Sequence, residues 1–456
     1  MSWPSPRGET PPSRRTRGEV SRGGIPNLSS AVRKVRLRKL TRSRSGVKNQ
    51  GHVLVVGAGM TGEQGPGKVI PVPERRYYSL IDKVYELRNL YEAWKAVKRN
   101  KGAAGVDQVS IARFEKNLES NLRRLHQRLQ DGTYKAPPVR RVYIDKADGS
   151  KRPLGIPAVA DRVCQMAAVR VLTPIFEAEF LPCSHGFRQG RSTRTAIAMV
   201  EEYRKQGFRW VVEVDFKSYF DTLDHAVLMA KVRARVTDGR ILGLIRSWLT
   251  AGVMSDGNLT YQTTGTPQGG VISPLLANIY LHGLDLALTN WGYKVVRYAD
   301  DLVVLCQSQN KAKTALGLLR QVAEGELRLT LHPEKTRITR FYEGFDFLGF
   351  SFKGRYRVAR KRALAKFKDR VRELTPRQTH RTLPEVIAEL NPVIRGWGNY
   401  FRHGHMKGRF EALDQWIRMR LRSLVLKRKA HRSRVASSML PNKRFESLGL
   451  VSLLTL

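Results

Sequence analysis

The spacing of apolar residues changes twice along this chain. Between Tyr78 and Leu90 the apolar positions recur at helical spacing, and a Gly-rich break at 102–106 separates this stretch from a second expected helix over about 111–129. From residue 139 to residue 350 short β-rich runs alternate with helical stretches, and after Gly354 the pattern is helical again. This order predicts an α+β domain followed by a helical domain.

Two of the β-rich runs lead directly into acidic side chains. Residues 211–214 are followed by Asp215, and residues 294–297 are followed by Tyr298-Ala299-Asp300-Asp301 and a second apolar run. The second arrangement predicts a hairpin with two adjacent carboxylates at its tip, which is costly unless a cation neutralises them. Mg²⁺ suits such a site because it binds carboxylate oxygens and substrate phosphates together. For the tetrapeptide taken alone, a solvated Asp-Asp turn is the alternative interpretation.

The charge of the chain favours a polyanionic partner. Of the 456 residues, 82 are Lys or Arg and 39 are Asp or Glu, which gives a formal net charge of +43, while 41% of the residues are hydrophobic. Residues 1–76 contain 16 basic and 4 acidic side chains, and residues 351–456 contain 26 and 7. Such a charge attracts nucleic acid and makes binding depend on salt. The hydrophobic fraction indicates a packed protein rather than a basic tail.

Residues 1–76 are rich in Gly, Pro, Ser and Arg without sustained periodicity, so we expect a basic, disordered extension. Glycines at 57–62 imitate a dinucleotide-binding fingerprint, but Pro71 and Pro73 follow where a helix is required, which rejects that interpretation. The three cysteines are too widely spaced to indicate a disulfide framework or a metal site. No apolar run approaches the ~20 residues of a membrane span. We therefore expect an intracellular protein with no membrane partner.

The acidic motifs and the segment between them resemble the reverse transcriptases of group II introns. In this resemblance the strand before Asp215 corresponds to the first catalytic motif of the polymerase palm, and Tyr298–Asp301 corresponds to the third. Between them, Thr266–Leu281 is similar to the second motif of the intron branch. Upstream, Tyr143–Pro157 resembles the fingers hairpin, and near the C-terminus Leu390–Phe401 resembles the maturase segment that binds intron RNA.

The resemblance implies an active site with two Mg²⁺ ions. The expected metal ligands are Asp215, Phe216 through its backbone oxygen, Asp300 and Asp301. Lys335 is the candidate general acid for departure of pyrophosphate, with a solvated lysine as the alternative. The residues expected to contact the incoming nucleotide are Lys146, Arg152, Phe216, Phe220, Gln268 and Gly269. In the family the position of Phe220 excludes a ribose 2′-OH, which favours DNA synthesis, although a core aromatic is the alternative.

The expected contacts to template and intron RNA lie outside the acidic motifs. They are Arg188, Arg395, Trp397, Tyr400, Arg418 and Arg422. Aromatic side chains beside arginine are the groups on which bases of RNA loops stack. A helical core with Trp397 and Tyr400 facing inward is the other interpretation of that segment, and the two can hold together. A solvated face is the alternative for the basic residues.

Together these expectations describe a right-hand polymerase. Residues 77–352 would form the fingers and an antiparallel palm sheet in an α+β domain, and residues 353–456 an α-helical thumb and maturase domain. The expected function is RNA-directed DNA synthesis, combined with binding of group II intron RNA to promote splicing and mobility. The partners would be the intron RNA, an RNA template, a DNA primer or target, and dNTPs.

Several points stay open in the sequence. The alternatives are a related bacterial reverse transcriptase of a defence or repair system, and an RNA-binding maturase without polymerase activity. Because no cysteine follows Cys306, we expect no zinc-dependent HNH endonuclease domain. The expected location is the bacterial cytoplasm, in a nucleoid-associated ribonucleoprotein. The sequence does not decide the oligomeric state.

Overall fold

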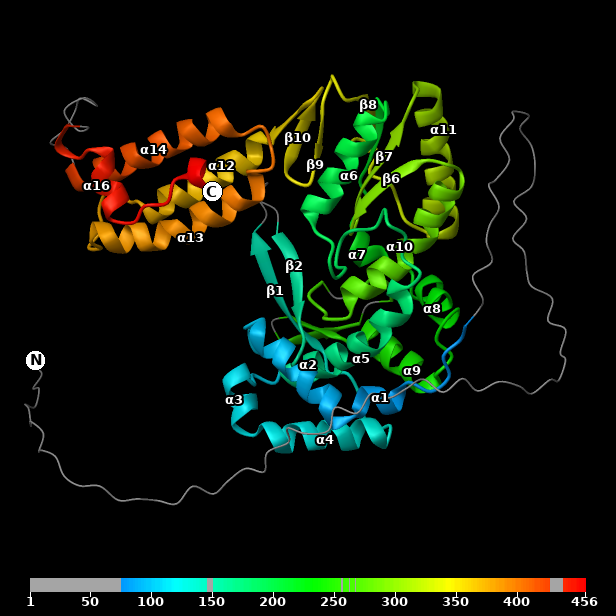
Figure 1. Ribbon diagram of the computed structural model, residues 1–456. Coiled ribbons are helices and arrows are strands. Elements are labelled where there is room, and N and C mark those ends of the chain that lie inside the picture. The colour runs from blue at the N-terminus through cyan, green and yellow to red at the C-terminus, as the bar shows by residue number, and fades with distance from the viewer. Residues whose placement is uncertain (1–74, 146–150, 256, 262, 267, 427–437) are drawn as a thin grey trace, which may run out of the picture. The chain divides into compact units, whose positions relative to one another are not determined.

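The computed structural model describes residues 75–145, 151–255, 257–261, 263–266, 268–426 and 438–456 (Figure 1). Two sequence expectations therefore lie outside the described residues. They are the N-terminal extension up to residue 74 and the tip of the fingers hairpin with Lys146. No helix in the described ranges is long and apolar enough to cross a membrane.

The first part of the described chain is helical, as the apolar spacing predicts. Its helices are α1 (Ile81–Tyr85), α2 (Leu87–Arg99), α3 (Ile111–Lys116), α4 (Leu118–Gln130) and α5 (Val159–Glu177). The second expected helix is divided into α3 and α4, because Asn117 leaves the helical region with φ −119° and ψ 39°. Leu90 and Trp94 on α2 and Leu172 on α5 belong to one buried cluster.

A four-stranded antiparallel sheet, here called the central sheet, carries both acidic motifs. Its strand order is β6 (Lys294–Tyr298), β7 (Asp301–Cys306), β3 (Trp210–Val214) and β8 (Arg337–Arg340). Successive residues of a strand point to opposite faces. Val212 and Val304 accordingly belong to the first buried cluster, and Val211 and Val303 to a second one. Burial on both faces fixes the register of these strands.

Helices alternate with the strands of the central sheet along the chain. They are α6 (Thr193–Lys205), α7 (Tyr219–Thr222), α8 (His225–Arg233), α9 (Gly239–Leu249), α10 (Ser273–Asn290), α11 (Gln309–Arg320) and the π-helical turn η1 (Gln321–Glu326). The N-terminus of α8 is capped by Asp224, whose side chain accepts a hydrogen bond from the Val227 N–H. The buried face of α10 includes Asn278 and Asp285, two polar residues that a packed helix requires to be paired.

A second sheet contains the hairpin expected to form the fingers. Its order is β2 (Lys151–Ile156), β1 (Val139–Asp145), β4 (Val253–Ser255) and β5 (Asn258–Thr260). Strand β1 runs antiparallel to β2 and parallel to β4. Arg152 is paired with Ile144, next to the last described pair of this hairpin, whose strands β1 and β2 are labelled in Figure 1.

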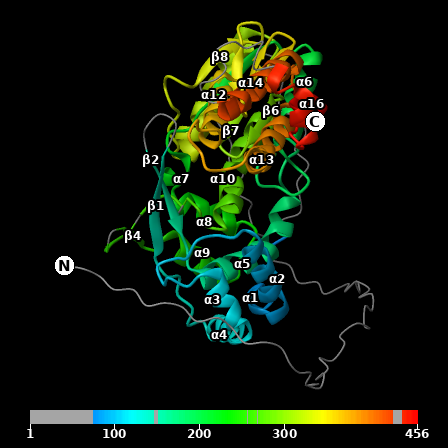
Figure 2. The same ribbon diagram turned by 90° about the vertical axis from the view of Figure 1, so that its left-hand side faces the viewer.

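The last part of the chain begins with a small sheet and ends in helices. The elements are β9 (Phe345–Phe347), β10 (Phe350–Lys353), β11 (Tyr356–Ala359), α12 (Lys361–Leu374), α13 (Leu383–Phe401), α14 (Lys407–Leu426), α16 (Asn442–Ser447) and η2 (Leu453–Thr455). Because β11 follows Gly354, the helical region begins at Lys361 rather than directly after Gly354. Helices α12, α13 and α14 lie side by side (Figures 1 and 2) and share a core with Phe367, Ile394 and Ile417.

Candidate active site

Asp215 and Asp301 lie opposite each other on neighbouring strands of the central sheet. The last pair between β3 and β7 is Val214 with Leu302. Continuing this antiparallel register by one residue places Asp215 opposite Asp301, with both side chains on the same face. Both residues also line one cavity of about 450 Å³. The fold therefore brings together acids that are far apart in the sequence.

Asp300 lies in the two-residue turn that joins β6 to β7, where Tyr298 is paired with Asp301. The first turn residue, Ala299, has a φ of +58°, as in a type II′ turn. Gly186 packs directly on this turn, because a Cβ atom on Gly186 would lie 2.3 Å from the Ala299 nitrogen. The strand-turn-strand prediction is confirmed, and the turn is held by neighbours rather than solvated.

Arg297 fixes this turn from inside the protein. Its fully buried guanidinium donates from Nη1 to the backbone oxygen of Ala299 and to Oδ1 of Asn278, each at 3.0 Å. It also donates from Nε and Nη2 to the two Asp285 oxygens at 2.8 and 2.5 Å, and from Nη2 to the Ser184 hydroxyl at 2.8 Å. A buried charge is tolerated when it is paired in this way. In the sequence Arg297 lies at the end of an expected strand, where nothing indicates a buried ion pair with Asp285.

The acids of the hairpin carry negative charge that the protein leaves largely uncompensated. Burial, followed by the charges of Asp300 and Asp215, raises the pKa of Asp301 to about 6. Burial also raises the pKa of Asp300, although the Arg152 charge acts in the opposite direction. Such clustering is typical of a cation site. No three His, Cys, Asp or Glu side chains in the described part of the chain are grouped closely enough to hold a metal ion alone. Other oxygens would have to complete a metal shell.

The backbone oxygen of Phe216 faces the acidic hairpin. Phe216 is bridged to Leu331, and backbone hydrogen bonds of 2.8 and 2.9 Å made by its neighbours Asp215 and Lys217 flank the bridge. In an antiparallel pair, the residue between two such bonds directs its own C=O to the other side. The other neighbour of β3 is β7, which begins at Asp301. The Phe216 oxygen is thus oriented toward the acids.

Lys335 lies beside Asp215 in this structure. Its Nζ is 3.3 Å from Asp215 Oδ2, with the two side chains 63% and 40% exposed. A solvent-exposed pair of this kind contributes little to stability. The ammonium group therefore remains available to a substrate, and its role as a general acid stays a prediction.

Gln268 connects the β1–β2 hairpin to the segment after Asp215. Arg152 Nε donates to Gln268 Oε1 at 2.7 Å, and Gln268 Nε2 donates to both carboxylate oxygens of Asp221 at 3.0 and 3.1 Å. Gly269 has a φ of +111°, and a Cβ atom there would lie 2.4 Å from the Gly155 oxygen. Two expected nucleotide contacts therefore lie together, with Asp221 as a partner that the sequence analysis did not single out.

Phe220 lies between the segment that follows Asp215 and the loop that precedes Gln268. Its ring is partly buried against the core and makes an edge contact with Tyr219 at 5.2 Å between ring centroids. Its backbone oxygen accepts a hydrogen bond of 2.7 Å from the Thr266 N–H. The position combines core packing with proximity to the loop of Gln268, so its role in sugar selection stays a prediction.

Arg188 requires a correction, because its guanidinium is used inside the protein. Its side chain is 5% exposed and pairs with Glu177, with donor distances of 2.7 to 3.1 Å. The remaining donors bind the backbone oxygens of Leu181 and Ser184 at 2.7 Å and of Phe180 at 3.2 Å. An arginine with its donors engaged in this way shapes a loop and is not available to template phosphates.

The two aromatic residues of the expected maturase segment differ in their surroundings. The Trp397 ring stacks on Phe367 at 4.5 Å and contacts Phe401 at 4.7 Å between centroids, as in the interpretation of a helical core, and a contact between Trp397 and RNA stays a prediction. Tyr400 is 37% exposed, and its hydroxyl donates to the Leu348 backbone oxygen at 2.8 Å. A contact between Tyr400 and RNA stays a prediction.

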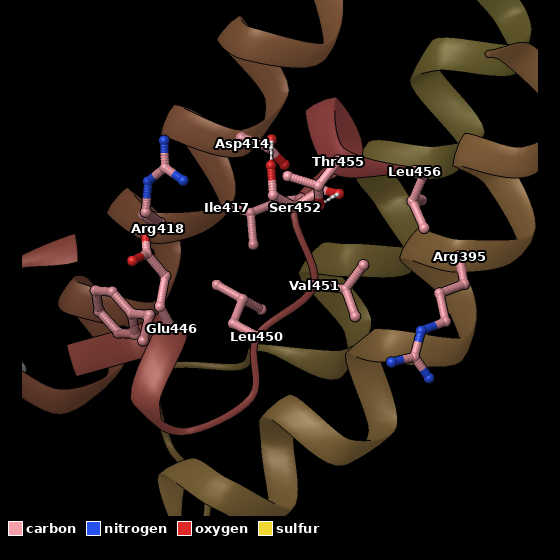
Figure 3. A pocket seen from close by; sticks show the side chains of 11 residues that line it. Arg395, Asp414, Ile417, Arg418, Glu446, Leu450, Val451, Ser452, Thr455 and Leu456 are labelled. Carbon is pink, nitrogen blue, oxygen red and sulfur yellow. Dashed lines mark hydrogen bonds between the residues drawn. The ribbon is translucent and has the colours of Figure 1, made fainter. Parts of the chain in front are cut away.

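The arginines of α13 and α14 also divide into two kinds. Arg395 and Arg418 lie on opposite sides of a cavity of about 420 Å³ (Figure 3). Arg422 instead donates to the Leu440 backbone oxygen at 2.9 Å and to Asn442 Oδ1 at 2.7 Å. These bonds hold part of the Arg422 guanidinium against residues 440–442, and RNA contacts of Arg395, Arg418 and Arg422 all stay predictions.

Comparison with known proteins agrees with these features. Residues 144–352 match the reverse transcriptase (RNA-dependent DNA polymerase) family, and residues 364–439 match the group II intron maturase-specific domain. Protein YkfC of Escherichia coli (strain K12) is 36% identical over 331 residues, which cover 64% of this chain and 85% of that protein. Group II intron-encoded protein LtrA of Lactococcus lactis subsp. cremoris is 41% identical over 198 residues, covering 43% of this chain and 32% of that protein. Among solved structures, the partial Cas6-RT-Cas1--Cas2 complex matches with a TM-score of 0.35 and 25% identity, over 54% of this chain and 42% of that chain.

The chain belongs to the reverse transcriptases. The maturase-specific domain that follows the polymerase domain places the chain among the group II intron-encoded proteins. The match to LtrA covers about a third of the length of LtrA. The expected family, the α+β polymerase fold and the helical domain after it are thereby confirmed.

Proposed function

We propose that this protein copies RNA into DNA by extending a primer. The observation that carries the proposal is the register of β3 and β7, which sets Asp215 opposite Asp301 beside the turn of Asp300. In the reaction the primer 3′-oxygen attacks the α-phosphorus of a dNTP. One P–O bond forms, the bond to pyrophosphate breaks, and the proton of the 3′-OH is released.

Asp215, Asp300 and Asp301, with the Phe216 backbone oxygen, would hold two Mg²⁺ ions. The donors suit this ion, because all of them are oxygens and three of them are carboxylates that lie close together. When bound, the ions stabilise negative charge on the attacking and leaving oxygens. Substrate phosphates would supply the ligands that the three carboxylates do not.

The remaining residues would orient the nucleotide and move a proton. Arg152 can bind the triphosphate through its forked donors, with Gln268 holding the guanidinium and Gly269 leaving room for a nucleotide. Lys146 is proposed as a second triphosphate contact, and Phe220 would exclude a 2′-OH. Lys335 would donate a proton to the departing pyrophosphate.

We also propose that the helical domain binds group II intron RNA and so promotes splicing and mobility of the intron. The match of residues 364–439 to the maturase-specific domain supports this role. Arg395 and Arg418, on two sides of one cavity, are the proposed phosphate contacts. An RNA template, a DNA primer or target, and dNTPs would be the further partners, in a nucleoid-associated ribonucleoprotein.

Primer extension on an RNA template tests the polymerase. Asp300→Asn should lower the rate roughly 10²–10³-fold, the range lost when one electrostatic group of an active site is removed. Asp369→Asn, an exposed acid on α12 that pairs with Arg372, is the matched control and should keep wild-type activity. Equal rates for wild type and Asp300→Asn would contradict the proposed site.

The same preparations decide between the alternatives when splicing of a group II intron RNA is measured beside extension. Wild type that promotes splicing without extending primers would be an RNA-binding maturase. Wild type that extends primers but shows no preference for intron RNA over a structured RNA of equal length would indicate a reverse transcriptase of another system. The proposal expects both activities, with Asp300→Asn losing extension and keeping RNA binding.

A further inference from the structure

The cavity of about 420 Å³ between Arg395 and Arg418 is lined by α13, α14 and α16 and by residues 449–456, here called the strap (Figure 3). Most of its lining residues come after residue 439, where the match to the maturase-specific domain ends. The cavity therefore depends on how the strap is attached to the helices.

Asp414 of α14 holds the middle of the strap. It is 3% exposed, and its Oδ2 accepts a hydrogen bond of 2.5 Å from the Ser452 hydroxyl (Figure 3). Its Oδ1 accepts a second bond of 2.9 Å from the Leu453 N–H. A buried carboxylate is stable when its oxygens are bound in this way. Because these bonds occupy Asp414, its charge is directed to the strap rather than to a ligand.

Helix α13 holds the two ends of the strap. The Asn391 amide donates to the Gly449 oxygen at 2.9 Å and accepts from the Val451 N–H at 2.9 Å. At the other end, a Cβ atom on Gly398 would lie 2.5 Å from Leu456 Cδ1, so the strap packs directly on the helix. The strap is thus fixed along its length, and the cavity beside it is a formed site.

The interior of the cavity is apolar, whereas two of its sides are cationic. Ile417 is buried, and Leu450 and Val451 pack against the second buried cluster. Within the described residues, neither Arg395 nor Arg418 has a side-chain partner. Other arginines of α14 are used internally, since Arg420 donates to the Thr375 oxygen at 2.6 Å and Arg422 to the Leu440 oxygen at 2.9 Å. The two arginines beside the cavity are therefore available to an anionic ligand.

A nucleotide within an RNA chain fits an apolar cavity with a cation on each side. A base has large apolar faces, and each internal nucleotide is flanked by two phosphates. A base inserted into the cavity would bring one phosphate toward Arg395 and the other toward Arg418. Only unpaired bases are free to insert, since those of a duplex are stacked and paired. An apolar peptide side chain would leave both arginines without an anion.

Glu446 is consistent with a base in the cavity. Of the two acids that line the cavity, Asp414 is bound to the strap, and Glu446 is exposed and has no side-chain partner in the part of the chain that the structure describes. Its carboxylate could accept a hydrogen bond from an amino group of a base, because unpaired bases are recognised along their edges. A third phosphate, by contrast, would be repelled.

We propose that this cavity binds one unpaired nucleotide of RNA, with its base between Ile417 and Val451 and its two neighbouring phosphates on Arg395 and Arg418. This inference rests on the proposed binding of RNA by the helical domain, because it names the part of the RNA that the domain recognises. Cavities of a few hundred Å³ with an apolar lining and few polar groups are typical of such sites.

A trinucleotide RNA tests the insertion, because its central base has a phosphate on each side. The probe carries fluorescent 2-aminopurine as the central base, and two unlabelled trinucleotides compete with it. One has adenine at the centre and the other has no central base. For wild type, the adenine competitor should bind about 10-fold more tightly than the abasic one, within the range for one stacked base. Equal affinities of the two competitors would overturn the proposal.

A variant that fills the cavity separates insertion of the base from general attraction to the chain. Val451→Phe leaves the charge unchanged, so it should lower the affinity for the adenine trinucleotide about 10-fold, to that of the abasic one, and keep the salt dependence. Leu454→Phe is the matched control, since Leu454 belongs to the strap, is 46% exposed and does not line the cavity. It should match wild type. Preference for adenine over the abasic trinucleotide in Val451→Phe would contradict the proposal.

A second filling variant applies if Val451→Phe does not fold. Thr455 lines the cavity from an exposed position, so Thr455→Trp should fill the space without disturbing the core. The same loss of preference for adenine is expected, and a preference as large as that of wild type would overturn the proposal.

The trinucleotide comparison keeps this inference separate from the proposed maturase function. Equal affinity of wild type for a group II intron RNA and for a structured RNA of the same length would refute specific binding of the intron. The trinucleotides contain no intron sequence, so they would still show whether the cavity accepts a base.

Discussion

At the scale of single residues, His185 shows how packing beside the acidic hairpin decides the protonation of a side chain. His185 is 1% exposed, with Nδ1 2.8 Å from the Thr195 hydroxyl oxygen. Burial first, and then the charges of Arg191, Arg188 and Arg297, lower the pKa of His185 to about 4. The neutral imidazole is therefore the form that belongs to the folded protein.

Acidification should destabilise the protein through His185. The unfolded chain takes up a proton near pH 6.5, whereas the folded protein resists until about pH 4, so stability falls as the pH drops through this window. The contribution of this one residue is about 2 kcal/mol between pH 8 and pH 5. Denaturant unfolding at both pH values should show a smaller loss for His185→Gln than for wild type. An identical pH dependence in the two proteins would assign the loss to other groups.

The role of an individual arginine could not be predicted from the sequence. Arg188, Arg297 and Arg395 look alike in a basic chain, where a solvated or nucleic-acid-binding side chain is the natural expectation. Their different roles depend on acceptors that are remote in the sequence, such as Asp285 for Arg297. The acids were easier to identify, because each directly follows an apolar run that predicts a buried strand.

At the scale of elements, the β6–β7 hairpin depends on a loop that packs against it. The segment before α6 approaches the turn so closely that only glycine fits at position 186. The His185 N–H donates to the Arg297 backbone oxygen at 2.8 Å, which ties the same loop to β6. The position of Asp300 is therefore set by two elements.

Gly186→Ala should displace the acidic turn. The added Cβ atom would lie 2.3 Å from backbone nitrogen of Ala299, a contact that cannot be relieved by rotating a side chain. We expect a loss of about 1–3 kcal/mol in unfolding free energy, typical of overpacking, and a larger relative loss of primer extension. Gly317→Ala on α11 meets open space and serves as the control. Wild-type activity in Gly186→Ala would show that the turn tolerates movement.

Elements whose signal is local were predicted well, and those set by distant contacts were not. The apolar runs around Asp215 and Asp301 predicted β3 and β7, because alternation and turn residues lie within a few positions of each other. The division of the second helix at Asn117 and the extension of the small sheet to Ala359 were missed. Strand β11 exists because it pairs with β10, and the sequence of residues 356–359 alone does not indicate that partner.

At the scale of the whole molecule, charge governs association with nucleic acid. The net charge of +43 exceeds what a single phosphate-binding site requires, and much of it lies in residues 351–456. Long-range attraction of this kind depends on ionic strength and carries little sequence information. Positioned phosphate contacts add to this attraction and orient the RNA, and Arg395 and Arg418 are the proposed contacts of this kind.

The salt dependence of intron RNA binding distinguishes general charge attraction from contacts made by Arg395 and Arg418. The double variant Arg395→Gln/Arg418→Gln should reduce the slope of log K against log salt by roughly 0.7–0.9 for each lost phosphate contact. Arg370→Gln/Arg372→Gln, which removes two arginines that are already paired with Glu373 and Asp369, is matched in charge and should change the slope less. Equal changes in both variants would mean that net charge, rather than these two positions, determines binding.

The buried arginine beside the acidic turn also limits how this protein can evolve. Ser184, Asn278, Asp285 and Arg297 share one set of hydrogen bonds. Replacing Asp285 or Arg297 alone strands a charge in the interior at a cost of roughly 3–5 kcal/mol, and replacing Ser184 or Asn278 leaves a buried donor unpaired at a cost of roughly 1–3 kcal/mol. Such positions tend to be inherited as a group and exchanged as a group. Transplanting the hairpin into another scaffold would therefore fail unless its partners on α10 and on the loop before α6 travelled with it.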